Sequence, residues 1–215
     1  MSTRVQFEQK LRQGLCSIVG EDHVIDDIRK LEPHTHDSSP FPPVAACMTL
    51  RPSSAEEISS ILKLANDSKF NVSVRGLGLS MTGRSSYDPV KTVVIDTTRL
   101  SNIHEIDEGN MVVRVGCGAV MGDIERELAK RRLYIHTVTV PLDYVTLGGV
   151  LSGVVGGELP PRRPVYGTGV NFILGLRVVL PQGNIMSTGA GGSNVCQKVD
   201  YEGIVCCIDY RHHLS

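Results

Sequence analysis

Three glycines within nine residues, from Arg75 to Gly83, mark the segment best suited to binding a phosphate group. The segment reads R-G-L-G-L-S-M-T-G and follows an alternating run that predicts a β-strand. Because glycine has no Cβ, successive backbone N–H groups of such a loop can approach one anion, and Ser80 and Thr82 add hydroxyl donors. A tight turn with positive φ would explain two of the glycines equally well. The loop alone therefore leaves both interpretations open.

The loop differs from the two best-known phosphate-binding patterns. A P-loop requires G-x-x-x-x-G-K-[ST], and no lysine stands at that position. A Rossmann fingerprint requires G-x-G-x-x-G at the start of a long helix, whereas Met81 occupies the place of the third glycine. The residues that follow, Tyr87, Asp88 and Pro89, are poor helix formers. The pattern therefore excludes a P-loop and argues against an NAD site.

A second glycine block, Thr146-Leu147-Gly148-Gly149, follows about seventy positions later. Two adjacent glycines after a threonine are also typical of simple close packing of the backbone. The block is therefore informative only through its occurrence together with the first.

The elements around the first loop predict one α/β lobe. A short strand over 48–51 precedes a capping-box pattern at 53–56 and an apolar helical stripe that begins at Ile58. Residues 71–75 alternate as in a strand, and 93–95 form a continuous apolar run typical of a strand buried on both faces. The loop is thus expected to connect two neighbouring strands.

A second lobe is predicted from about Ile103 onward. It contains a strand over 111–115, a helix over 121–132 with Ile124 and Leu128 on its inner face, and two strands over 176–180 and 185–188. The sequence P-Q-G-N between these last two strands favours a turn, so we expect them to pair.

The N-terminal region is predicted to be an amphipathic helical arm over residues 1–32, followed by an extended linker over 33–43 with four prolines. The linker contains His34-Thr35-His36-Asp37, which could suggest a metal site. A metal needs further ligands on rigid structure, and none is evident nearby. We therefore favour a solvated loop here.

Composition excludes several classes of partner. A net charge of −1 favours neither nucleic acid nor an anionic membrane, and no stretch approaches the length of a membrane span. The six cysteines form no C-x-x-C pair, so we expect reduced thiols and no metal. We find no secretory signal and expect an intracellular protein, cytoplasmic rather than mitochondrial because Glu8 and the later acidic residues argue against a mitochondrial address.

Taken together, the blocks resemble the vanillyl-alcohol oxidase and p-cresol methylhydroxylase flavoprotein family. The branch that they resemble most is that of the 2-hydroxy-acid dehydrogenases, which includes the glycolate oxidase flavin subunit and D-lactate dehydrogenase. The resemblance extends from about Val19 to about Gly192 and rests on the order and spacing of these motifs: V-G-E-D at 19–22, D-S-S-P at 37–40, R-P-S-S-A-E-E-I at 51–58, R-G-x-G at 75–78, D-x-x-T-x-G-G at 143–149, Y-G-T at 166–168 and L-G-L-R-V-V-L-P-x-G at 174–183.

The resemblance implies an α+β fold of the p-cresol methylhydroxylase type, with FAD held between two lobes. It places the pyrophosphate at the first loop and the flavin near the second block. The residues implied in cofactor binding are Arg75, Gly76, Leu77, Gly78, Leu79, Ser80, Met81, Thr82, Pro141, Thr146, Gly148, Gly149, Ser152 and Gly153. Many family members bind FAD covalently through a histidine in the glycine loop. Leu79 stands at that place, so we expect non-covalent FAD.

Some residues depart from the family pattern. Val150 replaces an asparagine common after the glycine pair, and Leu79 and Arg84 stand where small residues are usual. After Asp200-Tyr201-Glu202-Gly203 the sequence ends within a few residues, so we expect the substrate-binding cap domain to be absent. The resemblance places the carboxylate-binding arginine and the catalytic base in that cap. We therefore assign no catalytic residue, and we interpret His212 and His213 as exposed tail residues.

These inferences predict three regions: an arm and linker over 1–44, a first lobe over 45–100 and a second lobe, incomplete at its end, over 101–215. The predicted function is that of the FAD domain of an oxidoreductase for a small 2-hydroxy acid, active once a cap is supplied. The alternative is a truncated, non-catalytic relative that acts as a subunit or a remnant, with a partner subunit.

Overall fold

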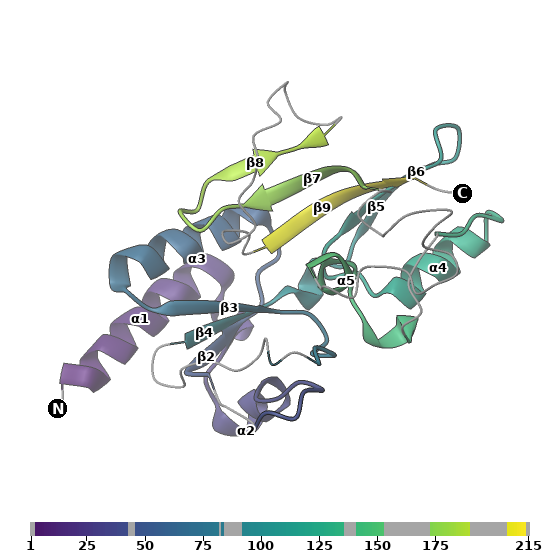
Figure 1. The fold of residues 1–215 in the computed structure, drawn as a ribbon. Helices are drawn as coiled ribbons and strands as arrows, with labels where there is room; N and C mark the ends of the chain where they lie inside the picture. The colour runs from purple at the N-terminus through teal and green to yellow at the C-terminus, as the bar shows by residue number, and fades with distance from the viewer. Residues whose placement is uncertain are drawn as a thin grey trace.

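The computed structural model shows two β-sheets with helices packed against them (Figure 1). It describes residues 3–42, 46–81, 83, 92–135, 141–152, 173–189 and 206–213. The first sheet has four strands in the order β1-β2-β4-β3, and the second has five in the order β5-β6-β9-β7-β8. Mixed helix and sheet content of this kind is the predicted α+β class.

The first sheet contains the strand from which the glycine loop leaves. Strands β2, β4 and β3 are parallel and β1 pairs antiparallel with β2; their bounds are Val24–Ile25 (β1), Met48–Leu50 (β2), Asn71–Arg75 (β3) and Thr92–Asp96 (β4). Val93, Val94 and Ile95 are fully buried, which confirms the prediction of a strand covered on both faces. Register pairs Arg75 with Asp96, so both strands end at the same edge.

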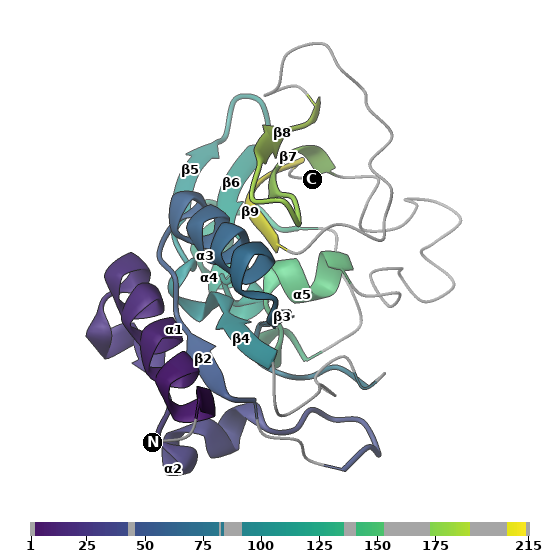
Figure 2. The same ribbon diagram turned by 90° about the vertical axis from the view of Figure 1, so that its left-hand side faces the viewer.

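Two long helices cover this sheet, α1 over Thr3–Val19 and α3 over Ala55–Ser68, and they lie side by side (Figure 2). The predicted capping box is displaced by one residue. The Ser54 hydroxyl, not that of Ser53, accepts a hydrogen bond from the Glu57 N–H at 3.1 Å, and the Glu57 carboxylate accepts from the Ser53 N–H at 2.8 Å.

The predicted helical arm is shorter than expected. After α1 ends at Val19, a 3-10 turn leads into β1, followed by α2 over Ile28–Leu31 and a 3-10 turn over Glu32–His34. Leu15 is fully buried, so α1 contributes to the core and is not a free arm.

The second sheet has its last strand in the middle. Its strands are β5 (Ile103–Asp107), β6 (Val112–Gly116), β7 (Ile173–Val179), β8 (Ile185–Ser187) and β9 (Cys206–His213). β9 pairs antiparallel with both β6 and β7. The interpretation of His212 and His213 as tail residues is therefore wrong for their backbone, because both belong to this central strand.

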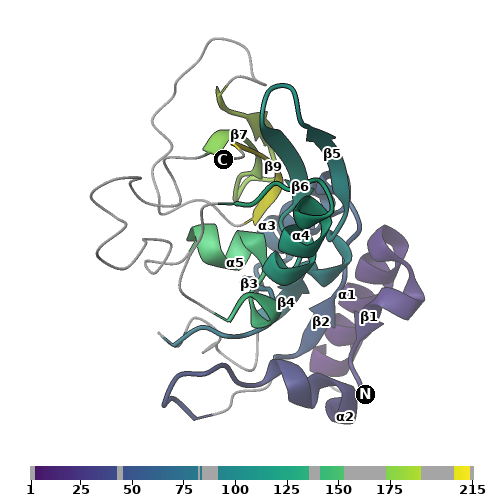
Figure 3. The same ribbon diagram turned by 90° about the vertical axis from the view of Figure 1, so that its right-hand side faces the viewer.

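Two helices, α4 over Met121–Ala129 and α5 over Leu147–Ser152, lie close to the second sheet (Figure 3). Ile124 and Leu128 are fully buried as predicted, but α4 ends at Ala129 and not at Arg132. A short 3-10 turn over Thr97–Arg99 precedes β5, and another over Leu142–Tyr144 precedes α5. Within the described ranges, no helix has the length and apolar character needed to cross a membrane.

Helix α3 connects the two sheets, since it contacts β3 of the first and β7 and β8 of the second. The turn between β7 and β8 lies on it: the Ser59 hydroxyl donates to the Gly183 carbonyl, and the Asn66 amide donates to the Pro181 carbonyl at 2.8 Å. Gly183 has a φ of 84°, which suits the predicted P-Q-G-N turn. This contact holds the second sheet against the first lobe's helix.

Candidate functional site

The glycine loop leaves β3 at the carboxyl end of the strand and runs as a series of bends without a hydrogen-bonded turn. Gly78 has a φ of 80°, a conformation that L-residues with a side chain rarely adopt. Within the described part of the chain, no hydrogen bond uses the backbone N–H groups of Leu77, Gly78 or Leu79. Three consecutive donors without internal acceptors are what an anion-binding loop requires.

The loop packs against the second glycine block. A Cβ placed on Gly76 would lie 3.1 Å from Thr146 Cγ2 and closer still to Thr146 Oγ1. Thr146 is 2% exposed, so this contact is in the interior. The structure therefore brings together the two blocks whose co-occurrence the sequence singled out, and it shows why position 76 is a glycine.

Thr146 also begins α5. Its hydroxyl accepts a hydrogen bond from the Gly149 N–H at 3.2 Å, in the manner of an N-cap, and its carbonyl accepts from the Val150 N–H at 3.0 Å. Gly148 donates to the Cys117 carbonyl at 2.8 Å, and a Cβ on it would lie 2.9 Å from the same oxygen. The glycine at 148 is thus explained by close packing against Cys117.

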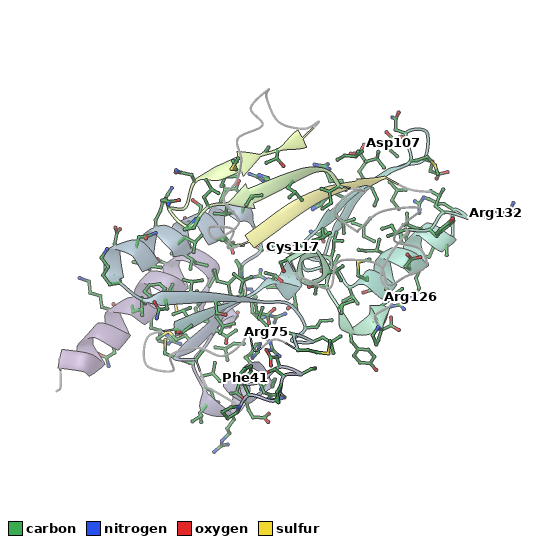
Figure 4. All side chains as sticks on the ribbon, viewed as in Figure 1. Phe41, Arg75, Asp107, Cys117, Arg126 and Arg132 are labelled. Atoms are coloured by element: carbon green, nitrogen blue, oxygen red, sulfur yellow. The ribbon has the colours of Figure 1, made fainter. Side chains whose placement is uncertain are left out.

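The Arg75 side chain turns back beneath its own loop. Its guanidinium donates to the His36 carbonyl at 2.8 Å and to the Pro33 carbonyl at 2.9 Å, and a Cβ on Gly78 would meet that guanidinium. Arg75, labelled in Figure 4, is the last residue of β3. The glycine loop is therefore attached to the segment predicted as a linker.

The prediction of a solvated loop is wrong for His34. Its side chain is 15% exposed, and Nε2 lies 3.2 Å from Asp96 Oδ2. Since a carboxylate can only accept, Nε2 carries the proton. Among the described residues, no group of three or more histidine, cysteine, aspartate or glutamate side chains is arranged to hold a metal ion.

Asp96 is 9% exposed and accepts hydrogen bonds on both oxygens. Burial alone would raise the pKa of this carboxyl, but the hydrogen bonds from His34 and from the Thr98 N–H outweigh it, so the pKa of Asp96 is lowered. Arg51 Nε, 3.9 Å from Asp96 Oδ2, adds a cation. A charged Asp96 therefore anchors the segment around His34 to the carboxyl end of β4.

A cavity of about 320 Å³ lies beside the loop. Its lining comes from the loop, the 36–38 segment and the turn before Thr146: His36, Asp37, Ser38, Arg75, Leu77, Gly78, Leu79, Asp143 and Tyr144. Asp143 is held by Arg126, whose Nη1 donates to Oδ1 at 2.6 Å. Three separate parts of the chain thus meet around one hollow.

Large apolar side chains on the loop are exposed. Leu77 is 41% exposed, Leu79 36% and Met81 65%, and Tyr144 across the cavity is 65% exposed. Exposed apolar side chains beside a hollow with both polar and apolar lining favour contact with a flat or apolar ligand. They flank the backbone donors of the same loop.

The other predicted site residues lie at the ends of the second block. Pro141 precedes the 3-10 turn over Leu142–Tyr144, and the Ser152 hydroxyl donates to the Gly149 carbonyl at 3.4 Å at the end of α5. Thr82 and Gly153 lie outside the described residues.

Some cavity residues were not predicted as site residues. Five such residues line the cavity: His36, Asp37, Ser38, Asp143 and Tyr144. The first three were assigned to the predicted linker, and the last two were noted only as part of the motif over 143–149. For Asp37, Ser38, Asp143 and Tyr144, the signal that could have found them was their place within D-S-S-P and D-x-x-T, two motifs of the resemblance; His36 adjoins the first of these.

Comparison with known families decides what this site belongs to. Residues 47–189 match the family described as FAD binding domain, which is more than half of the chain. The chain belongs to this FAD-binding family. The cofactor is therefore FAD, as expected.

The relatives with curated names include an FAD-linked oxidoreductase, a dehydrogenase and an oxidase subunit. An FAD-linked oxidoreductase of Mycobacterium tuberculosis is 28% identical over 87% of this chain and 40% of its own length. D-lactate dehydrogenase of Archaeoglobus fulgidus is 30% identical over 66% of this chain and 31% of its own, and a glycolate oxidase subunit of Bacillus subtilis is 25% identical over 83% and 37%. The chain thus spans about two fifths or less of the length of these relatives.

Solved structures confirm the fold type. p-Cresol methylhydroxylase with bound substrate superposes with a TM-score of 0.78 at 19% identity, over 97% of this chain and 43% of that one. The predicted fold of the p-cresol methylhydroxylase type is confirmed, and so is the resemblance on which it was based.

The described residues fit FAD on structural grounds. The cofactor has a charged pyrophosphate between two flat ring systems, and the loop offers backbone N–H donors beside exposed apolar side chains. The residues that would hold it are Gly76 to Met81, with the segment from Thr146 to Ser152 next to them.

Proposed function

We propose that the chain holds FAD non-covalently, with the pyrophosphate on the backbone N–H groups of the loop from Gly76 to Met81. The observation that carries this proposal is the packing of Gly76 on Thr146, which joins the loop to the second block as one surface. Leu79 has no nucleophilic atom that could bond to the flavin, which supports non-covalent binding. The division into an arm and linker over 1–44 and lobes over 45–100 and 101–215 stays a prediction.

We further propose that the substrate of the whole protein is a small 2-hydroxy acid. Support comes from the names of the relatives, which are a D-lactate dehydrogenase and a glycolate oxidase subunit. When bound, FAD supplies the two-electron acceptor for oxidation of such a hydroxyl carbon. The residues of this chain hold and orient the cofactor, and we assign no catalytic residue among those described.

Absorbance of the purified 215-residue chain between about 350 and 500 nm, a window for bound flavin, tests the cofactor proposal. We expect a yellow protein, or one that becomes yellow when FAD is added and excess is removed. Acid precipitation should leave the flavin in the supernatant. A flavin that stays with the pellet would contradict non-covalent binding.

Reduction of a dye with D-lactate, glycolate or D-2-hydroxyglutarate tests the substrate class, and an aldose serves as the control. We expect reduction with a 2-hydroxy acid only, once the remaining part of the protein is present. A protein that holds FAD but reduces the dye with none of these acids under that condition supports the non-catalytic alternative.

A further inference from the structure

The contacts of Arg75 differ from those of a pyrophosphate ligand. Both of its terminal nitrogens donate to backbone carbonyls of another segment, Nη1 to His36 at 2.8 Å and Nη2 to Pro33 at 2.9 Å. A guanidinium presents its donors in a fixed planar fork, so two carbonyls bound in this way fix its orientation. The side chain thus links the start of the loop to the 33–36 segment.

The 33–36 segment is itself anchored to the same sheet edge. His34 Nε2 lies 3.2 Å from Asp96 Oδ2, and Asp96 is the register partner of Arg75 at the ends of the parallel strands β3 and β4. The Thr97 hydroxyl then donates to the Arg75 carbonyl at 3.1 Å. These contacts form a closed circuit that runs from the end of β3 through the 33–36 segment to the end of β4 and back.

This closed set of contacts lies against the glycine loop. A Cβ on Gly78 would meet the Arg75 guanidinium, so this side chain supports the residue with positive φ from below. If the guanidinium moved, the backbone at Gly78 would lose this neighbour, and the loop that carries the N–H groups of Leu77, Gly78 and Leu79, unpaired within the described part of the chain, would be less fixed. Preorganised donors bind an anion better than donors that must be ordered on binding.

We propose that Arg75 is a positioning residue for the cofactor loop, and that it acts together with His34 through the backbone of the 33–36 segment. The proposal rests on the function proposed above for the loop. The resemblance implied only that Arg75 is one of the residues around the pyrophosphate; the proposal gives it the role of a clamp that positions the backbone of the loop. It also gives His34, a residue of the predicted linker, a part in cofactor retention.

Four variants of the 215-residue chain test this proposal: Arg75→Lys, Arg75→Gln, His34→Ala and the double variant Arg75→Gln/His34→Ala. FAD dissociation constants are measured by flavin fluorescence. A positioning role predicts that lysine, which keeps the charge but not the fork, weakens FAD binding as much as glutamine does. Recovery of wild-type affinity in Arg75→Lys would overturn the proposal, because charge alone would then suffice.

The double variant measures coupling between the two side chains. We expect its loss of affinity to be smaller than the product of the two single losses by about threefold or more, since both changes open the same circuit. Independent, multiplicative losses would overturn the proposal. Arg132→Gln and His104→Ala are the matched controls, because both residues are exposed and Arg132 lies beyond the C-terminal end of α4 (Figure 4).

Amide chemical shifts separate this proposal from the proposed function. Without any FAD, the NMR amide signals of residues 76–81 should shift or broaden in His34→Ala and in Arg75→Gln relative to the wild type, and the two controls should match it. A wild-type chain that binds no FAD would defeat the proposed function, while altered loop signals would still support the clamp. Unchanged loop signals in both variants would overturn the clamp whether or not FAD binds.

Discussion

The backbone of Gly76 lies against the side chain of Thr146, so closely that a Cβ at position 76 would be 3.1 Å from Thr146 Cγ2. Thr146 in turn caps α5 through the Gly149 N–H. This contact makes the glycine loop and the second block one unit. The position of the loop therefore depends on residues seventy positions away.

Replacement of Gly76 with alanine should weaken FAD binding and lower stability, because the new methyl group needs the space that Thr146 fills. The double variant Gly76→Ala/Thr146→Ala should be less destabilised than the sum of the single changes, although the threonine alone contributes about 1 kcal/mol as a cap. Urea unfolding of the four chains measures this coupling. Strict additivity would show that the two residues do not share a contact.

Gly78→Ala should destabilise the chain by roughly 1–2 kcal/mol, because an L-residue at a φ of 80° is strained. The new Cβ should also displace the Arg75 guanidinium from beneath the loop. The control is Gly109→Ala, where a Cβ would meet only an ordinary contact at 3.5 Å. Equal unfolding midpoints for the two variants would argue against the positive φ at Gly78.

Ser59→Ala should lower the free energy of unfolding by roughly 1–3 kcal/mol, because it leaves the buried carbonyl of Gly183 without its hydrogen-bond donor. Ser60→Ala is the matched control on the same helix, since that hydroxyl is exposed and bonds only to the Glu56 carbonyl of its own turn. Thermal or urea unfolding of both variants tests the contact between α3 and the β7–β8 turn. A larger loss of stability for Ser60→Ala than for Ser59→Ala would contradict the contribution of the contact between Ser59 and Gly183.

Asp96 should make stability depend on pH at the acidic end. Its pKa is lowered in the folded chain from the ordinary value of 3.8, so the folded state favours the carboxylate. This contribution is fully present above that ordinary value and is lost as pH falls below it. The stability difference between wild type and Asp96→Asn should thus be largest near neutral pH and should shrink below about pH 4.

Asp67→Asn provides the control for the loss of a carboxylate, because Asp67 is exposed on α3. Its free energy of unfolding should differ from that of the wild type by no more than roughly 0.5 kcal/mol. A wild-type advantage over Asp96→Asn that grew as pH fell would contradict the direction of the pKa shift at Asp96.

Elements with a strong local pattern were predicted well from the sequence. The apolar stripe from Ile58 and the run Val93 to Ile95 carry their periodicity within a few residues, and both are buried as predicted. The capping box was misplaced by one residue because Ser53 and Ser54 each have a glutamate three positions later. Local sequence cannot choose between two equivalent caps.

Features that depend on distant partners were missed. Strand β1 has two residues, too few for a periodic pattern, and exists through pairing with β2. The contacts of Arg75 go to backbone carbonyls, which leave no trace in residue types. The partner of His34 is Asp96, sixty-two positions away, so a linker rich in prolines gave no sign of it.

Titration of the chain with FAD tests most directly the claim that the glycine loop binds the cofactor. The wild type, Gly78→Val and Gly109→Val are compared, since the second glycine lies in the β5–β6 turn away from the site. We predict that wild type and Gly109→Val retain FAD through gel filtration and that Gly78→Val, folded by circular dichroism, does not. Retention of FAD by Gly78→Val with wild-type affinity would contradict the assignment of the loop.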